Sequence, residues 1–340
     1  MGLDNHEVLL YTSLMIDFER LNNLKKQLDF YKPFPDEIIK NLDEWYKVEL
    51  TYTSNAIEGN TLSRQETALV VEKGITVDGK TITEHLEAIN HAKAWDYIQN
   101  LKHKSVKEIT QQTVFDIHSQ ILDNIDNSNA GKYRNVPVRI AGSTVVMPNS
   151  YKVNILMKNF FRWLHSSNMN MVDLAIIAHY KFVSVHPFTD GNGRTGRLLM
   201  NLILMQGGFL SAIIRKEERK DYINAIEKGQ LTEDISDYIN MMYSSIERSL
   251  LIYLESFQPK KEVITYKSSK LLKIGELAKL TDEPVHTIRY WTKEGLLKAK
   301  DYSKGGYYLY DSESVKKVKQ IRELQSEKRL TIKELKKYLN

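Results

Sequence analysis

A twelve-residue stretch, His186-Pro-Phe-Thr-Asp-Gly-Asn-Gly-Arg-Thr-Gly-Arg197, gathers the residue types best suited to chemistry on phosphates. Pro187 disfavours helical geometry at His186, so the apolar helix expected over 172–185 should end there. Gly191 and Gly193 permit backbone conformations that other residues avoid and let a ligand approach the chain closely. A second apolar helix follows at once. N–H groups at a helix start preceded by glycines form an anion cradle.

Two arginines and a carboxylate complete this candidate site. Arg194 and Arg197 are three residues apart and can share one face of the first helical turn. With Asp190 and the free N–H groups they suit phosphates and a divalent cation. His186 titrates near neutrality and is the candidate general base. The alternative is a glycine-rich turn with surface arginines, against which the density of these residue types argues. A Walker-type loop is excluded because its Gly-x-x-x-x-Gly-Lys-Ser/Thr pattern is absent.

The stretch resembles the signature of the Fic family, His-Pro-Phe-x-Asp/Glu-Gly-Asn-Gly-Arg-x-x-Arg, at every defined position. The resemblance implies a helical core that moves AMP from ATP to Ser, Thr or Tyr hydroxyls of proteins. It implies that His186 deprotonates the hydroxyl, that Asp190 holds Mg²⁺, and that Asn192 and the loop amides hold the α- and β-phosphates. The two arginines would take the outer phosphates. The implied nucleotide-binding set is Gly191, Asn192, Gly193, Arg194, Thr195, Gly196, Arg197 and Tyr222.

Three further features flank this loop. Tyr222 resembles the aromatic residue near the adenine, although an amphipathic helix often places a tyrosine at its boundary. Residues 136–148 read as a short hairpin, which resembles the family's flap that pairs with the substrate backbone; an ordinary hairpin is the alternative. The preceding Gly131-Lys-Tyr-Arg134 also resembles family positions. His179, in the buried helix, is predicted to be a hydrogen-bonded core histidine.

The segment Thr53-Ser-Asn-Ala-Ile-Glu-Gly-Asn60 places Ser54 and Glu58 one turn apart on a helix that Gly59 should stop. From the spacing alone this is an ordinary helix end. Beside the loop it resembles the family's inhibitory motif, Ser/Thr-x-x-x-Glu-Gly/Asn. The resemblance implies that Glu58 pairs with Arg197, takes the γ-phosphate position and prevents productive ATP binding. In some relatives the same glutamate positions water to remove AMP, so reversal stays open.

Composition sets the frame around these motifs. The 340 residues are 42% hydrophobic and 27% charged, as in a soluble protein of two or three domains. The absence of cysteine excludes disulfides, thiolate zinc sites and thiol nucleophiles. No basic region precedes an apolar run at the N-terminus, and the apolar stretch 198–205 is too short to span a bilayer. A cytoplasmic protein without membrane contact is expected.

The C-terminal part differs in charge. From residue 260 onward 20 basic residues stand against 11 acidic ones, a net of +9, while the preceding residues carry a net of −4. The basic tail indicates an anionic partner or a solvated basic surface. Its Ile274-Gly-Glu-Leu-Ala278, Thr287-Ile-Arg-Tyr290 and Glu294-Gly-Leu-Leu297 resemble the winged helix-turn-helix of MerR-type regulators. The resemblance implies DNA contacts from Thr287, Arg289, Tyr290 and, on the wing, Lys304.

This tail departs from the MerR pattern in two ways. Tyr308 stands where the wing usually carries an arginine, and the long dimerising helix is missing. DNA and a protein are therefore both open as its partner. We predict a mainly α fold with four parts: an N-terminal helical region (1–104), a Fic core with its hairpin flap (105–256), a linker (257–270) and a winged helix-turn-helix (271–340).

Two classes of function remain open at this point. The first is an autoinhibited protein adenylyltransferase that uses ATP and Mg²⁺. The second is a DNA-binding regulator whose core only senses nucleotide, but a sensor would not need the general base His186. Transfer of another phosphate-containing group is a third option, against which the complete Gly191–Arg197 loop argues. The target protein, the releasing signal and the oligomeric state are not indicated.

Overall fold

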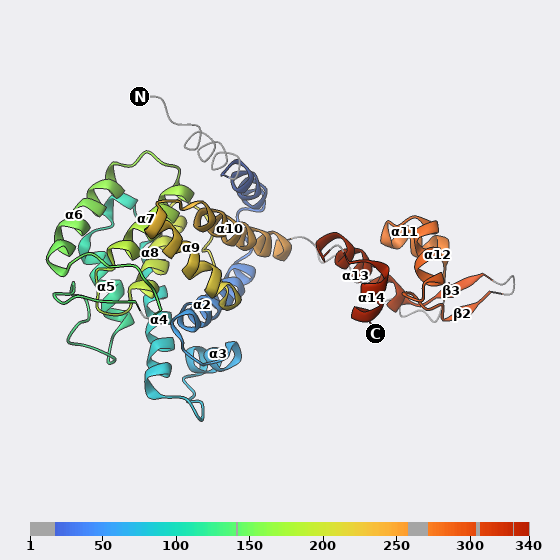
Figure 1. Ribbon diagram of the computed structural model, residues 1–340, viewed down its shortest axis with the longest axis horizontal. Helices are drawn as coiled ribbons and strands as arrows, with labels where there is room; N and C mark the ends of the chain where they lie inside the picture. Colours follow the sequence, from blue (N-terminus) through green and yellow to red (C-terminus); the bar gives the residue numbers. More distant parts are fainter. Residues whose placement is uncertain (1–17, 141, 258–270, 304–306, 329, 340) are drawn as a thin grey trace. The chain divides into compact units, whose positions relative to one another are not determined.

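The computed structural model describes residues 18–140, 142–257, 271–303, 307–328 and 330–339 (Figure 1). The chain forms two compact units that divide between Pro259 and Lys260, and each is described by itself. Most of the predicted linker, residues 258–270, lies outside the described residues. Within the described ranges, no helix combines the length and apolarity needed to cross a membrane.

The N-terminal unit is helical, which confirms the predicted mainly α fold, and its described residues contain no β-strand. Following a helical segment that ends near residue 29, the α-helices are α2 (Asp36–Glu58), α3 (Arg64–Lys73), α4 (Ile82–Leu101), α5 (Gln111–Ile121), α6 (Ser150–Ser166), α7 (Met171–Val185), α8 (Asn192–Gln206), α9 (Arg219–Thr232) and α10 (Ser236–Phe257), with short 3-10 helices η1 (Val106–Glu108) and η2 (Lys216–Glu218).

Helices α7 and α8 form the most extensive helix pair of the unit, and the other helices surround them (Figure 1). Every residue of α8 from Arg194 to Leu204 is buried, and a helix buried on all sides must be central. Gly196 permits the close approach of the pair. A Cβ at Gly196 would lie 3.1 Å from Val183 Cγ1 and 3.2 Å from the Phe182 ring.

The N-terminal helices position the predicted inhibitory motif. Both α2 and α4 pack against α8. Helix α2 ends at Gly59, which has the left-handed φ of 106° that favours glycine. Ser54 and the residues through Ile57 are buried in its last turn. The buried part of the motif, Ser54–Ile57, therefore packs inside the unit, while Glu58 at the helix end remains exposed.

Residues 136–148 do not form the predicted hairpin. Their described part contains a turn at Ser143 but no strand ladder. The physical reason is that side chains outside the segment form hydrogen bonds with its ends and with its turn. The Arg134 guanidinium binds carbonyl oxygens at both ends, at 3.1 and 2.6 Å. The Glu227 carboxylate accepts from Ser143 Oγ and from the next backbone N–H, both at 2.9 Å.

The described residues of the C-terminal unit form four helices and a small sheet. Its elements are β1 (Leu272–Lys273), α11 (Ile274–Thr281), α12 (Val285–Lys293), β2 (Asp301–Tyr302), β3 (Tyr308–Tyr310), α13 (Ser312–Lys328) and α14 (Ile332–Leu339). The antiparallel order is β1-β3-β2, with Leu272 opposite Tyr310 and Tyr302 opposite Tyr308. The sheet thus adds β1 to the predicted two-stranded wing. Trp291 and Tyr310 are fully buried in the hydrophobic core of the C-terminal unit.

Replacing Gly196 by alanine is expected to lower the free energy of unfolding of the N-terminal unit by about 1–3 kcal/mol, because the added methyl group overpacks the α7–α8 contact. Urea denaturation followed by circular dichroism measures the change. Gly275→Ala is the control, since a Cβ at this exposed helical glycine meets nothing within 4 Å. It should stabilise the C-terminal unit by about 0.5–1 kcal/mol. Equal stability of Gly196→Ala and the parent chain would contradict the packing argument.

Candidate active site

The loop between α7 and α8 sets the geometry of the site. Helix α7 ends at His186 (φ 49°) and α8 begins after Gly191 (φ 73°), both left-handed. No side chain caps the α8 N-terminus, so its first N–H groups are available to an anion. The Asn192 amide both accepts from and donates to the Phe188 backbone, at 2.9 Å each. The Asn192 side chain was expected to contact a phosphate. In this structure its amide is occupied by the Phe188 backbone, so its backbone N–H is the group that remains for a ligand.

His186 is half-buried at the end of this loop and is poised as a base. Its Nδ1 lies 3.3 Å from the carbonyl oxygen of Val183. A carbonyl only accepts, so Nδ1 carries the proton and Nε2 keeps the lone pair. Burial lowers the pKa of His186 below its ordinary value, against the opposing effect of the Val183 hydrogen bond. The ring is therefore neutral near pH 7 and can accept a proton.

Arg197 is brought together with both residues of the predicted inhibitory motif. Its Nη2 lies 2.7 Å from Glu58 Oε1 and 2.8 Å from the carbonyl oxygen of Ser54. Its Nε donates to Ser54 Oγ at 3.0 Å. Burial disfavours the charged guanidinium, but Glu58 and Tyr222 outweigh that effect and raise the pKa of Arg197. Nη1 is buried without a hydrogen-bond partner among the described residues, so this arginine retains an unused donor nitrogen.

The Glu58 carboxylate also lies against the start of α8. A Cβ built on Gly193 would come within 2.1 Å of Glu58 Oε1 and 2.9 Å of Arg197 Nη1. Glycine at this position therefore lets a carboxylate oxygen approach the helix N-terminus, where negative charge is stabilised. Glu58 occupies the place that the loop offers to an anion.

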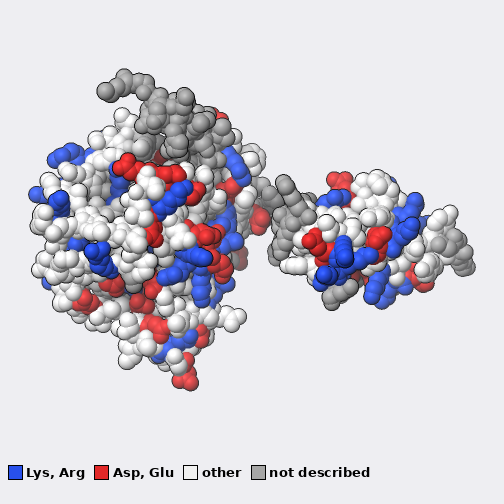
Figure 2. All heavy atoms as spheres, in the orientation of Figure 1, with Lys and Arg blue, Asp and Glu red and all other residues white. Residues whose placement is uncertain are grey.

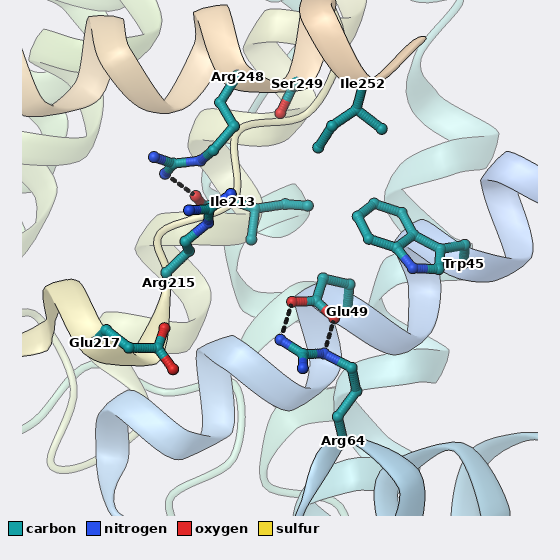
Figure 3. A pocket seen from close by; sticks show the side chains of 9 residues that line it. All are labelled: Trp45, Glu49, Arg64, Ile213, Arg215, Glu217, Arg248, Ser249 and Ile252. Atoms are coloured by element: carbon teal, nitrogen blue, oxygen red, sulfur yellow. Dashed lines mark hydrogen bonds and ion pairs between the residues drawn. The ribbon is translucent and has the colours of Figure 1, made fainter. Parts of the chain in front are cut away.

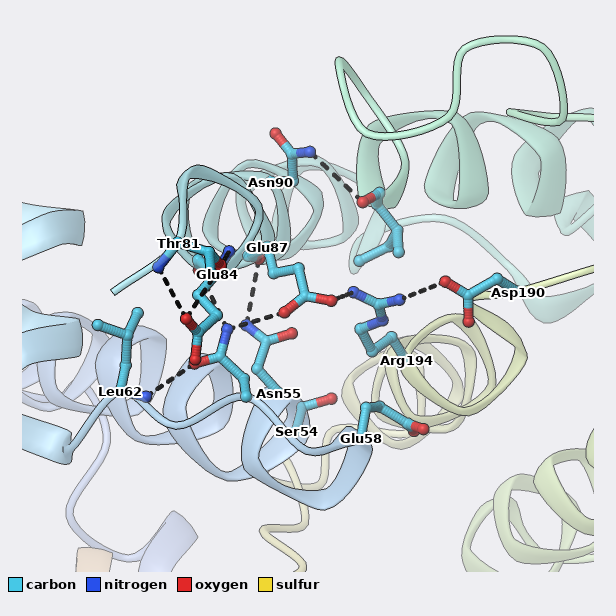
Figure 4. A network of polar contacts seen from close by, with 12 residues as sticks. Ser54, Asn55, Glu58, Leu62, Thr81, Glu84, Glu87, Asn90, Asp190 and Arg194 are labelled. Carbon is cyan, nitrogen blue, oxygen red and sulfur yellow. Dashed lines mark hydrogen bonds and ion pairs between the residues drawn. The ribbon is translucent and has the colours of Figure 1, made fainter. Parts of the chain in front are cut away.

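Arg194 is the centre of a second ionic network (Figure 4). Its Nη1 lies 2.9 Å from Glu87 Oε1 on α4, and its Nη2 lies 3.1 Å from Asp190 Oδ2. The other Glu87 oxygen accepts from the Asn60 amide at 2.8 Å. The network joins the end of the inhibitory segment to the loop carboxylate. Since the Arg194 side chain is only 2% exposed, it is held in place before any ligand arrives.

Asp190 is the loop residue best placed for a divalent cation. Its side chain is 69% exposed, although it is paired with Arg194. The described residues contain no group of three or more His, Asp or Glu side chains suited to a metal. An oxygen-ligated ion such as Mg²⁺ takes few protein ligands and completes its shell with phosphate oxygens and water. One exposed carboxylate beside an anion cradle fits that chemistry.

Sequence profiles and solved structures agree with this geometry. The profile of the Fic/DOC family matches residues 108–204, and that of the MerR HTH family regulatory proteins matches residues 272–340. The structure of Fic-1 from C. elegans shares 31% sequence identity, covers 74% of this chain and 78% of that one, and has a TM-score of 0.64. This chain belongs to the Fic family.

Other Fic proteins extend the comparison. The Fic domain containing signaling protein of Bacteroides thetaiotaomicron has a TM-score of 0.64 at 25% identity, over 69% of this chain and 97% of that one. The Protein adenylyltransferase Fic of Aedes aegypti is 34% identical over 247 residues, or 70% of this chain and 48% of its own length. The Drosophila ananassae protein of the same name is 37% identical over 206 residues, or 60% and 41%. This chain thus spans less than half the length of these curated relatives.

Three expected nucleotide contacts of this Fic chain lie inside its core. Thr195 is fully buried, and Gly196 packs on α7. Tyr222 is only 3% exposed, and its hydroxyl donates to Nε2 of His179 at 3.0 Å. The ring therefore supports Arg197 and the core and offers no open face to an adenine. His179 also faces the Tyr238 hydroxyl at 2.7 Å, which confirms that it is a hydrogen-bonded core histidine.

Three residues that the sequence did not assign hold the Fic loop from outside. Glu87 fixes Arg194. His118 stacks on Phe188 with ring centroids 3.6 Å apart, and its Nε2 lies 3.0 Å from the Asp190 carbonyl oxygen. Arg134 donates to the carbonyl oxygen of His186 at 2.7 Å. Only Arg134 had a sequence signal, the family-like stretch that ends with it.

The predicted DNA contacts of the second unit lie on α12. Arg289 and Tyr290 are exposed next to each other, and Thr287 is half-buried one turn earlier. Lys304 lies outside the described residues. Basic side chains gather in patches on the face of this unit seen in Figure 2. Among the described residues of the predicted set, the exposed pair on α12 is the most accessible to a partner.

Three buried histidines predict how stability depends on pH. Burial lowers the pKa of His91 and His179 to about 3 and that of His118 to about 4, against an ordinary 6.5. Between those values the unfolded chain binds more protons, so stability is complete above pH 6.5 and falls as the pH falls. Each histidine contributes a slope of up to about 1.4 kcal/mol per pH unit. Urea unfolding of the N-terminal unit between pH 7 and 5 measures it.

The matched variant is His179→Gln, which lacks one titrating ring. Its free energy of unfolding should therefore change less steeply with pH, by the contribution of one histidine, whatever its absolute stability. A pH-independent free energy of unfolding between pH 7 and 5 would contradict the neutral burial of these rings.

Proposed function

We propose that this chain is a protein adenylyltransferase that moves AMP from ATP to a Ser, Thr or Tyr hydroxyl of a target protein. The observation that carries the proposal is the neutral His186 at one end of a loop whose other end offers uncapped N–H groups and two buried arginines. A nucleotide sensor would need the cradle alone. The named relatives, which are protein adenylyltransferases, support the same activity.

The residues assign the steps as follows. The target oxygen attacks the α-phosphorus, its proton passes to Nε2 of His186, and the bond to the bridging oxygen breaks to release pyrophosphate. The α8 N-terminus and Arg197 bind the phosphates, and Arg194 is kept rigid by Glu87. Mg²⁺ held by Asp190 would neutralise charge on the phosphates. Positioning and charge neutralisation supply most of the catalysis in this reaction class.

The resting protein is proposed to be autoinhibited. Glu58 takes an Arg197 nitrogen and lies over the α8 start, so a γ-phosphate and Glu58 compete for one place. An arginine–carboxylate pair shielded from water is strong enough for this competition. The substrate backbone is proposed to lie along residues 136–148, the segment that resembles the family's flap. β-Augmentation there would use the backbone groups that Arg134 and Glu227 leave unpaired.

Removing the Glu58 side chain tests both the activity and its inhibition. Glu58→Gly should raise AMP transfer at least about tenfold, because Arg197 loses its competing partner, and adding His186→Ala should abolish it. Mass spectrometry of the protein and of lysate proteins incubated with ATP and Mg²⁺ detects the AMP adduct. Glu44→Gly, an exposed position on the same helix, controls for the loss of helix propensity. Equal adduct signals from Glu58→Gly and its His186→Ala double variant would refute the mechanism.

The C-terminal unit is proposed to bind DNA through α12. Arg289→Ala should weaken binding and reduce the dependence of log affinity on log salt by about one, as loss of one phosphate contact requires. A gel shift assay with duplex DNA at several salt concentrations measures both quantities. Lys333→Ala on α14 is the control for loss of one exposed charge. Binding of the parent chain that does not weaken with salt would favour a protein partner instead.

A further inference from the structure

A pocket of about 500 Å³ lies outside the candidate active site (Figure 3). One wall is formed by Trp45 and Glu49 from the middle of α2 and by Arg64 from α3. The other wall is formed by residues 213–217 and by α10. The volume is within the range of small-molecule sites. None of the steps assigned above uses this pocket.

Two of the three arginines that line the pocket are paired with carboxylates, and the third is not paired with any described residue. Arg64 makes a bidentate pair with Glu49 at 2.5 and 2.8 Å. Arg248 makes a second one with Glu218 at 2.8 and 3.0 Å. Arg215 is exposed on the same rim, and its guanidinium makes no hydrogen bond or ion pair with the residues that the structure describes. One guanidinium is therefore left to bind an anionic group.

The remaining lining specifies the rest of the ligand. Trp45, 41% exposed, and Ile252 on α10 present apolar surface across the pocket from Arg215 (Figure 3). An indole face and an unpaired guanidinium suit a flat apolar ring that carries an anion. Glu217 is also exposed at the rim, and its negative charge opposes ligands with several anionic groups. The fitting ligand has one anionic group, carboxylate or phosphate, on an aromatic ring.

We propose that this pocket is a regulatory site for such an aromatic anion. Helix α2 carries Trp45 and Glu49 in the pocket and Glu58 in the active site. A ligand that touches α2 and the opposite wall binds most tightly when α2 is docked, so its binding stabilises the docked position. Docked α2 holds Glu58 within reach of Arg197, so that the pair re-forms whenever it opens. A ligand in the pocket therefore suppresses AMP transfer. This consequence rests on the proposed autoinhibition, whereas the binding of the ligand to the pocket does not depend on it.

Ligand binding is tested first, with phenylacetate and phenyl phosphate as probes of the two anion sources. Saturation-transfer NMR titrations of the full chain give their affinities. At least one probe should bind, and Arg215→Gln should weaken it about tenfold, the value of one charge-assisted contact. The Arg215 guanidinium loses no partner among the residues that the structure describes, so this variant should fold normally. Glu217→Gln should bind the probe at least as well as the parent chain.

Controls separate this site from other kinds of pocket. Neutral phenylacetamide and ring-free acetate or inorganic phosphate should bind at least tenfold more weakly. Failure of both probes, equal binding by Arg215→Gln, or equal binding of the amide would overturn the proposal. Zwitterionic phenylalanine that binds better than phenylacetate, and is weakened by Glu217→Gln, would also overturn the assigned ligand class.

Regulation is tested by reciprocity. The factor by which the probe weakens transfer-competent ATP binding must equal the factor by which ATP weakens the probe. Glu58→Gly should remove the suppression of adduct formation by the probe while leaving probe binding detectable. Probe binding that leaves ATP affinity unchanged would overturn the regulatory role. If no variant forms an AMP adduct, the proposed function fails, but the ATP–probe coupling can still be measured by binding alone.

Discussion

The buried guanidinium of Arg197 is the constraint on which the N-terminal unit depends. The residue is 5% exposed, and a buried charge that loses its partners is destabilising by several kcal/mol. In this structure α2 provides the partners, through Ser54 and Glu58. A nucleotide phosphate would satisfy the same donors. In the proposed mechanism, Glu58 and a substrate phosphate are thus alternative partners for one buried charge, which would let a single carboxylate control the site.

The surroundings of the two loop arginines are arranged to add hydrogen bonds without adding positive charge. His91 and His179 are buried near Arg197, and burial together with that arginine keeps both rings neutral. His91 Nδ1 lies 3.1 Å from the Thr51 hydroxyl on α2. Neutral imidazoles can donate and accept in the same core, so they link helices where a further cation would repel the arginines. The pH dependence of stability follows from this choice.

The sequence identified the parts of the site that are local. The loop from His186 to Arg197 and the Ser54–Glu58 pair each lie within a short stretch with fixed helical spacing, and the structure brings the two together. Glu87 could not be predicted as a site residue because it contacts Arg194 from a helix 107 residues earlier, and no spacing rule connects such positions. The side-chain partners of Asn192 and Tyr222 could not be derived from the sequence, since side-chain direction depends on packing, and their nucleotide contacts stay predictions. The prediction of a hairpin at residues 136–148 was wrong because Arg134 and Glu227 bind backbone groups that a strand ladder would need.

The contrast in burial across the Arg197–Glu58 pair bears on how the proposed inhibition would be released. The arginine side chain is 6% exposed but the glutamate side chain is 36% exposed, so only the carboxylate can leave for water at low cost. Helix α2 is held independently, for example by Arg219 Nε on the Ile57 carbonyl oxygen at 2.6 Å. Glu58 can therefore rotate away while α2 stays docked. As long as the helix stays, the carboxylate remains at high effective concentration and returns, so lasting activation requires α2 to move as well.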